Sequence, residues 1–235
     1  MYKMKFGVVT FPGSNCDEDI VYVLETIFDQ KVERLWHKDT DLKGVDFVVL
    51  PGGFSYGDYL RSGAIAKLSP IMGEVIKHAK NGGYVLGICN GFQILTESGL
   101  LEGALLHNDN QKFICKNVHL KSVAGVGTAI TKDLNATKAY KIPIAHGEGR
   151  FFASKETLQK LNDNGQILFK YCDADGNISA ESNPNGSLEN IAGICNEGKN
   201  VFGMMPHPER AADAELSNED GAEMFRSILN HCNAQ

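Results

Sequence analysis

Apolar runs alternate with segments of helical periodicity over roughly the first hundred residues of the chain. Runs rich in β-branched and aromatic residues predict strands at 5–11, 31–36, 46–53 and 83–88. Apolar residues spaced three and four apart predict helices at 16–29, 69–81 and 90–98. Most of these strands are apolar along their whole length, which is typical of a parallel sheet covered on both faces by helices.

The second half of the chain has a different pattern. Residues 112–123 alternate between apolar and polar positions, as antiparallel strands do, and 142–151 predict a strand that runs into a glycine-rich turn. Further strands are predicted at 166–172, 191–196 and 200–205, and helices at 155–164 and 220–231. The last two strands predict a hairpin with its turn at 197–200.

The two halves together predict an α/β fold. We expect one domain over residues 1–235, with a mostly parallel central sheet, helices on both faces and an antiparallel extension in the second half. In such sheets the ligand binds beyond the carboxyl ends of the parallel strands. The turns at 10–15, 50–58 and 87–91 should therefore share one rim.

Composition and charge narrow the classes of function. A net charge of −6 over 235 residues argues against nucleic acid or an anionic membrane as the main partner. No apolar stretch reaches the roughly 18 residues of a membrane span. The apolar N-terminal run ends in Pro12-Gly13 like a strand, not like a secretory signal. The six cysteines form no Cys-x-x-Cys pair, which predicts reduced thiols in a cytosolic protein.

One cysteine lies at a predicted strand-to-helix corner, in the sequence Gly87-Ile88-Cys89-Asn90-Gly91. A nucleophile on such a turn needs small neighbours two residues away on each side. The helix that follows directs free N–H groups at the sulfur, which favours the thiolate. The backbone N–H of Asn90 would then face an oxyanion that forms on a substrate. The alternative is a packing cysteine at a tight turn.

A base for this thiol is found near the C-terminus. The predicted strand at 200–205 runs into Pro206-His207-Pro208-Glu209. In an extended segment His207 and Glu209 would project to one side, which suits an imidazole oriented by a carboxylate. A histidine on a surface turn is one alternative, and a metal site of His207, Glu209 and Cys89 is another.

These residues resemble those of a known family, the class I glutamine amidotransferases. More narrowly, the chain is similar to the glutaminase subunits of phosphoribosylformylglycinamidine synthase, an enzyme of purine biosynthesis. The resemblance runs from end to end. The matching segments are 7–19, 50–66, 87–95, 145–151 and 203–210.

The resemblance implies that Cys89, His207 and Glu209 hydrolyse glutamine through a thioester. It further implies an oxyanion hole made by the N–H groups of Gly53 and Asn90. Gly52 and Gln93 are implied to contact the substrate, and no cofactor or metal is implied in this chain. From the residues alone, the preferred interpretation of Gln93 is a polar residue on an exposed helix face.

Two further segments stand out around these motifs. Residues 54–66 are long and rich in glycine and tyrosine for a simple connection, so they predict a wall of the substrate pocket and a docking edge for a partner. His146 and Glu148 flank Gly147 after a predicted strand, and we expect partner contact or support of the pocket. The alternatives are an ordinary surface loop and a structural hydrogen bond of His146.

The sequence has no Gly-x-x-x-x-Gly-Lys phosphate loop that would bind ATP. The resemblance implies that partner subunits carry out the ATP-dependent step. A large synthetase subunit would use ATP and magnesium with the ammonia made here, and a small third subunit would join the complex in the cytoplasm. Two other functions remain open at this point. One is another cysteine hydrolase, such as a peptidase or a γ-glutamyl hydrolase, and the other is a noncatalytic regulatory subunit.

Overall fold

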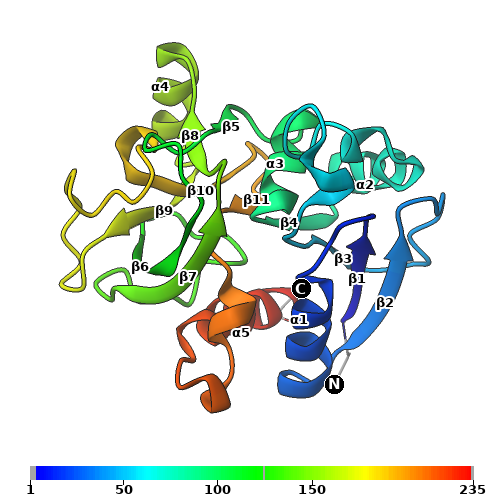
Figure 1. Ribbon diagram of the computed structural model, residues 1–235. Coiled ribbons are helices and arrows are strands. Elements are labelled where there is room, and N and C mark those ends of the chain that lie inside the picture. The colour runs from blue at the N-terminus through cyan, green and yellow to red at the C-terminus, as the bar shows by residue number, and fades with distance from the viewer. Residues whose placement is uncertain (1–3, 124, 234–235) are drawn as a thin grey trace.

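A nine-stranded sheet is the centre of the computed structural model, which describes residues 4–123 and 125–233 (Figure 1). The order across the sheet is β2-β1-β3-β4-β11-β10-β9-β6-β7. The strands of this sheet are β1 Lys5–Thr10, β2 Lys31–Trp36, β3 Phe47–Leu50, β4 Tyr84–Ile88, β6 Ile114–Ser122, β7 Tyr140–His146, β9 Ile167–Cys172, β10 Ile191–Cys195 and β11 Val201–Met204.

The first half of the sheet is parallel, as the apolar strands predict. β1 pairs in parallel with β2 and β3, and β4 pairs in parallel with β3 and β11. β3 and β11 are buried along their whole length, and β4 is buried from its second residue on. The ends of β3, β4 and β11 are therefore neighbours on one rim, with Leu50 opposite Gly87 and Met204 opposite Ile88.

The second half of the sheet is antiparallel. β10 pairs with both β11 and β9, and β6 pairs with both β9 and β7. Buried and less buried positions alternate along β7 and the second half of β6, as the period-two pattern predicts. The predicted antiparallel extension and the β10–β11 hairpin are confirmed. Strands from both halves of the chain form this one sheet, which agrees with a single domain. That the domain spans residues 1–235 stays a prediction.

Helices cover both faces of the parallel strands, as expected. Figure 1 shows α2 and α3 on one side of these strands and α1 and α5 on the other. The helices are α1 Asp17–Tyr22, which continues as a π-helical turn Val23–Ile27, α2 Pro70–Lys80, α3 Asn90–Glu97, α4 Lys155–Asp163 and α5 Asp220–Asn233. In the part of the chain that the structure describes, no helix is both long and apolar enough to span a bilayer.

One small element of the structure is not predicted from the sequence. β5, Ala104–Leu106, pairs in antiparallel fashion with β8, Arg150–Phe152. Three residues are too short to show a period of two, so no strand is predicted at β5. This pair ties the segment after α3 to the turn that follows β7, and that turn reaches the candidate site.

Candidate active site

Cys89 lies at the corner between β4 and α3, in an unusual backbone conformation. Its φ is 51° and its ψ is −107°, and Asn90 begins the helix directly after it. A positive φ is uncommon for a residue with a side chain. A Cβ at Gly87 would lie 2.6 Å from the carbonyl of Gly91, and one at Gly91 would overlap the carbonyl oxygen of Leu50. These contacts agree with the steric reason for small residues on both sides of the cysteine.

His207 and Glu209 follow β11 and form a buried pair. The Nδ1 atom of His207 lies 2.6 Å from Oε1 of Glu209, and both side chains are almost wholly buried. The pairing is as expected, but the extended backbone predicted for it is wrong. Residues Pro208–Ala211 form a 3-10 turn, so Glu209 reaches back to the ring from a turn. The carboxylate accepts the Nδ1 proton and thereby fixes the tautomer of the neutral ring.

The charge state of His207 follows from its neighbours. Burial disfavours the imidazolium, but the carboxylate of Glu209 and the sulfur atoms of Cys89 and Cys16 outweigh this effect. The pKa of His207 therefore lies well above its ordinary value. A histidine of this kind holds a proton at neutral pH and can give it to a leaving group.

Gly52 lies between the candidate nucleophile and the candidate base. A Cβ at this position would lie 2.7 Å from Cε1 of His207 and 3.4 Å from Cβ of Cys89. Cys89 and His207 also line one cavity together with Ala145. The structure thus brings the two side chains together although 118 positions separate them in the sequence.

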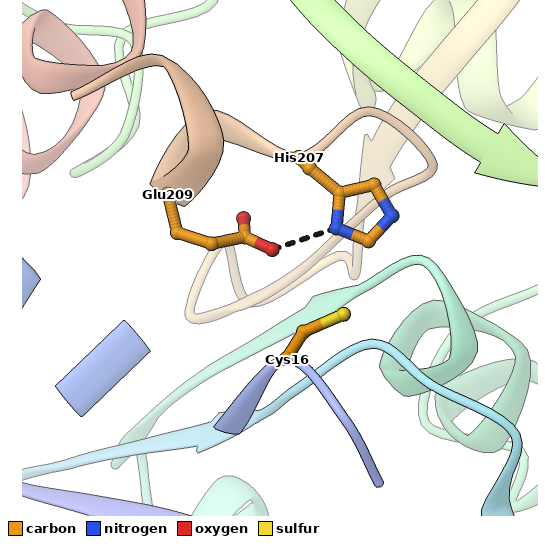
Figure 2. Close-up of side chains that lie close together, drawn as sticks. All are labelled: Cys16, His207 and Glu209. Carbon is orange, nitrogen blue, oxygen red and sulfur yellow. Dashed lines mark hydrogen bonds and ion pairs between the residues drawn. The ribbon is translucent and has the colours of Figure 1, made fainter. Parts of the chain in front are cut away.

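A second thiol, Cys16, lies beside the same histidine and was missed by the sequence analysis (Figure 2). Donor atoms of Cys16, His207 and Glu209 lie within 4.8 Å of one another. The thiol of Cys16 donates to Oδ1 of Asn15 at 3.1 Å and accepts from Arg210 at 3.2 Å. Its place directly after the 10–15 turn, on the predicted rim, is the signal that could have identified it.

The surroundings distinguish the two thiols. Burial raises the pKa of Cys16 above its ordinary value, and the nearby imidazole of His207 offsets this only in part. Cys16 lines one cavity beside the histidine, whereas Cys89 lines that cavity and a second one as well. The alternative of a metal site expected Cys89 as a ligand beside His207 and Glu209. The donor groups that cluster in the structure are those of Cys16, His207 and Glu209 instead. Because His207 and Glu209 are hydrogen-bonded to each other, the cluster is arranged as a carboxylate-oriented histidine beside a thiol.

Gly53 and Asn90 lie on two turns that are joined by a hydrogen bond. The backbone N–H of Ser55 donates to Oδ1 of Asn90 at 3.2 Å. Gly53 has a φ of 135°, and a Cβ there would lie 2.8 Å from Cα of Ser14. Only glycine allows this close approach of backbones. Gly53 lines the cavity that contains Cys89, so both turns border the same space.

Gln93 is buried, so the alternative of an exposed helix face is wrong. Its side chain is only 5% exposed and lines the cavity beside Cys89. Its amide oxygen accepts from Asn90 at 2.9 Å, and its amide nitrogen donates to the backbone carbonyl of Glu148 at 2.6 Å. Gln93 therefore links the helix after the nucleophile to the turn after β7. A contact with substrate stays a prediction.

The cavity beside Cys89 has a volume of about 150 Å³ and receives residues from both halves of the sheet. Asp58 and Ser62 come from the loop after β3, and His146 and Glu148 come from the end of β7 and the turn that follows it. This placement matches the expected pocket wall at 54–66 and the expected pocket support by His146. His146 also makes the structural hydrogen bond that was its alternative, from Nδ1 to Oδ1 of Asn108 at 3.0 Å.

Comparisons with known proteins agree with this geometry. Residues 3–231 match the family of the CobB/CobQ-like glutamine amidotransferase domain. Phosphoribosylformylglycinamidine synthase subunit PurQ of Synechocystis sp. is 58% identical over 94% of this chain and 99% of that protein. The subunit of the same name from Nostoc sp. is 54% identical over 96% of this chain and 97% of that protein.

A solved structure shows the same likeness in three dimensions. A chain in the structure of PurLQS from Thermotoga maritima is 42% identical, with a TM-score of 0.85, over 98% of this chain and all of that one. The chain therefore belongs to the CobB/CobQ-like glutamine amidotransferase family and, within it, to the family of phosphoribosylformylglycinamidine synthase subunit PurQ.

Proposed function

We propose that this chain is the glutaminase subunit of phosphoribosylformylglycinamidine synthase and that Cys89, His207 and Glu209 are its catalytic residues. One observation carries the assignment of residues: Cys89, raised on a strained corner, shares a cavity with a histidine whose Nδ1 is held by a buried carboxylate. The names of the relatives support the reaction, since they are subunits of this synthase over nearly their full length.

The reaction follows from the placement of these groups. The thiolate of Cys89 attacks the side-chain amide carbon of glutamine, and the N–H groups of Gly53 and Asn90 receive the charge that forms on the amide oxygen. His207 gives a proton to the departing nitrogen, and ammonia leaves a γ-glutamyl thioester on Cys89. His207 then takes a proton from water as that water attacks the thioester. Glutamate is released, and the Cys89 thiolate is restored beside the protonated His207.

Glycine at position 52 and the buried amide of Gln93 complete this part of the proposal. Gly52 leaves room between Cys89 and His207 for the reacting group, because any side chain there would contact both residues. Gln93 holds Asn90 from one side and the Glu148 carbonyl from the other, which supports a role at the wall of the glutamine site.

The ammonia is proposed to pass to a synthetase subunit. Ammonia released into neutral water is mostly protonated and no longer nucleophilic, so a protected route to a second site is needed. The synthetase would use it, with ATP and magnesium, to convert formylglycinamide ribonucleotide to formylglycinamidine ribonucleotide in the cytoplasm. The solved relative belongs to a structure named PurLQS, which supports a complex with two further subunits.

The face around the cavity is suited to receive this partner. Tyr59 and Leu60 are 71% and 78% exposed on the loop that also supplies a wall of the cavity. Phe54 and Phe113 line the same cavity, with ring centroids 6.2 Å apart, and both are exposed. Exposed apolar side chains that adjoin a catalytic cavity are typical of an interface. The expected docking edge at 54–66 therefore becomes part of the proposal.

The test is a glutaminase assay with and without the cognate synthetase. We expect slow hydrolysis by the isolated chain and faster hydrolysis in the complex. Cys89→Ala should abolish glutamine-dependent product formation while the complex still uses ammonium salt. Full turnover without the synthetase, or loss of both activities in the variant, would contradict the proposal. Preferred cleavage of peptides or polyglutamates would point to another cysteine hydrolase, and no glutaminase activity at all to a regulatory subunit.

A further inference from the structure

The cavity beside Cys89 carries two carboxylates and no strong cation. Asp58 and Glu148 both line it, and none of its lining residues is lysine or arginine. Among the residues that the structure describes, neither carboxylate pairs with a lysine or an arginine. Glu148 lies 3.4 Å from Nε2 of His107, a largely exposed ring that carries charge only when it is protonated. Among the described residues, the negative charge of this wall is therefore offset weakly, by His107 nearby and by Arg61 at longer range.

The two carboxylates are held in place by neutral groups. Asp58 accepts a hydrogen bond from Nδ2 of Asn90 at 3.3 Å, and Glu148 accepts one from the backbone N–H of Ser62 at 3.4 Å. Arg61, which could have neutralised them, is turned to Glu97 instead, with two bonds of 2.7 and 2.8 Å. Within the described residues, this arrangement leaves both carboxylates without a salt bridge to lysine or arginine, and Arg61 attracts Glu148 only at longer range.

The electrostatic cost of this arrangement is visible at Asp58. The pKa of Asp58 is raised to about 6: burial is the largest cause, the hydrogen bond with Ser62 opposes it, and the charge of Glu148 adds to it. Two carboxylates that disfavour one another's charge are typical of a site that binds a cation. A bound cation would relieve the repulsion.

A separate observation in the same cavity points to a ligand with N–H groups. His146 is only 3% exposed, and its Nε2 atom finds no hydrogen-bond partner within residues 4–123 and 125–233. The tautomer is fixed by Asn108, whose Nδ2 donates to the carbonyls of Lys112 and His146, so that its Oδ1 must accept from Nδ1 of His146. Burial lowers the pKa of His146 to about 4, so Nε2 carries a lone pair at neutral pH.

We propose that Asp58 and Glu148 bind the α-ammonium group of the substrate glutamine, at the end of the cavity remote from the scissile amide. The inference rests on the proposed function, which places the amide carbon at Cys89. An ammonium carries one positive charge and three donors, and this wall offers two carboxylates and the bare acceptor of His146. Asp58 and Glu148 would then be the residues that distinguish glutamine from amides without an amino group.

The inference is tested with a matched pair of substrates in the assembled complex. Glutamine is compared with 4-carbamoylbutanoate, which has the same amide and carboxylate but lacks the amino group. We expect the wild-type protein to prefer glutamine in kcat/KM by about 100-fold or more, because charge-assisted hydrogen bonds to a partly buried group would be lost with the analogue.

Glu148→Gln and Asp58→Asn keep the shape of each side chain and remove its charge. Each should reduce the preference for glutamine by roughly tenfold, mainly through KM for glutamine. The activity toward 4-carbamoylbutanoate is the internal readout of folding. Glu102→Gln is the matched control, because Glu102 pairs with Lys160 on the surface and does not line the cavity. It should leave the preference unchanged.

The outcomes separate this inference from the proposed function. If the variants keep the wild-type preference, or lose both activities in equal measure, the ammonium site is wrong while Cys89-dependent hydrolysis of glutamine stands. If the wild-type complex hydrolyses neither substrate, or if Cys89→Ala remains fully active, the proposed function is wrong and the ammonium site falls with it.

Discussion

The parallel and antiparallel halves of the sheet contribute different things to the candidate site. Cys89 follows β4, His207 follows β11 and Gly53 follows β3, so the proposed reacting groups are placed by three adjacent parallel strands. His146 and Glu148 come from the end of β7 and the turn after it, in the antiparallel half. The ends of the parallel strands position the proposed reacting groups, and the antiparallel extension forms the opposite wall of the cavity.

The difference shows how one scaffold can combine a fixed reaction with a variable substrate site. The parallel half is constrained by close contacts at Gly52, Gly87 and Gly91, which leave no room for a side chain at these positions. The wall from the antiparallel half is made of side chains that are held by single hydrogen bonds. Changes at these strand ends of the first half should therefore affect turnover, whereas changes in the second half, and at Asp58 on the loop after β3, should affect recognition.

The largest effect in this comparison is expected from Glu209→Gln. Without the carboxylate, the largest effect that opposes burial is lost and the pKa of His207 falls, so the imidazolium loses its proton at lower pH. We expect kcat to fall by about 10²- to 10⁴-fold, as for other catalytic histidines that lose their orienting carboxylate. The alkaline limb of the pH profile of kcat should move to lower pH.

The measurement is the pH dependence of glutamine hydrolysis in the complex. Glu219→Gln, an exposed residue at the start of the last helical region, is the control. An unchanged alkaline limb in Glu209→Gln would mean that the carboxylate does not act through His207.

A smaller loss of turnover is expected from Gly52→Ala. The added methyl would lie 2.7 Å from the ring of His207 and 3.0 Å from the sulfur of Cys16, and the buried ring has little room to move. We expect kcat to fall by roughly 10- to 100-fold with KM much less affected, since a displaced base costs proton transfer rather than binding.

Gly73→Ala is the matched control for this change. A Cβ at Gly73, within α2, meets no atom within 4 Å, so this variant should be as active as the wild type and slightly more stable. The measurement is kcat and KM of both variants in steady-state assays of glutamine hydrolysis. Equal kcat values for the two would show that the space between Cys89 and His207 is not needed.

The smallest expected effect concerns stability rather than activity. The pKa of Asp58 is raised from 3.8 to about 6, so the folded state disfavours the charged carboxyl and its cost is fully present above pH 6. Asp58→Asn should raise the free energy of unfolding at neutral pH by about 1 kcal/mol, a value that allows for screening of a half-exposed group. Asparagine also tolerates the positive φ at this position.

Thermal unfolding of the variant and the wild type at pH 7.5 and pH 4 is the measurement for this prediction. The gain should be about 2–4 °C near neutral pH and should shrink toward pH 4, where Asp58 of the wild type is protonated. A gain that is the same at both pH values would show that it does not arise from the charge.

The sequence was informative where the pattern is local. The strands β1 to β4 and the elbow at Cys89 follow from apolar runs and glycine spacing, and the motif 206–209 points to the base. The sequence could not show that Cys16 lies beside His207, because this contact joins the turn after β1 to the turn after β11 across the sheet. It also missed β5 and the burial of Gln93, which depend on packing between distant segments.

The backbone at Glu209 shows the same limit. An extended segment is the natural expectation for Pro-x-Pro after a strand, but the chain turns at Pro208 to pack against other elements, and the carboxylate still reaches the ring. The chemical pairing was therefore predictable from residue types, whereas the backbone path that produces it was not.

The most direct test asks which of the two thiols beside His207 reacts. The complex is treated with 6-diazo-5-oxo-norleucine, a glutamine-like electrophile, and the modified residue is identified by mass spectrometry of its peptides. We predict one equivalent of label on Cys89, none on Cys16, and protection by excess glutamine. Label on Cys16, or no label on either cysteine, would contradict the assignment of Cys89 as the nucleophile.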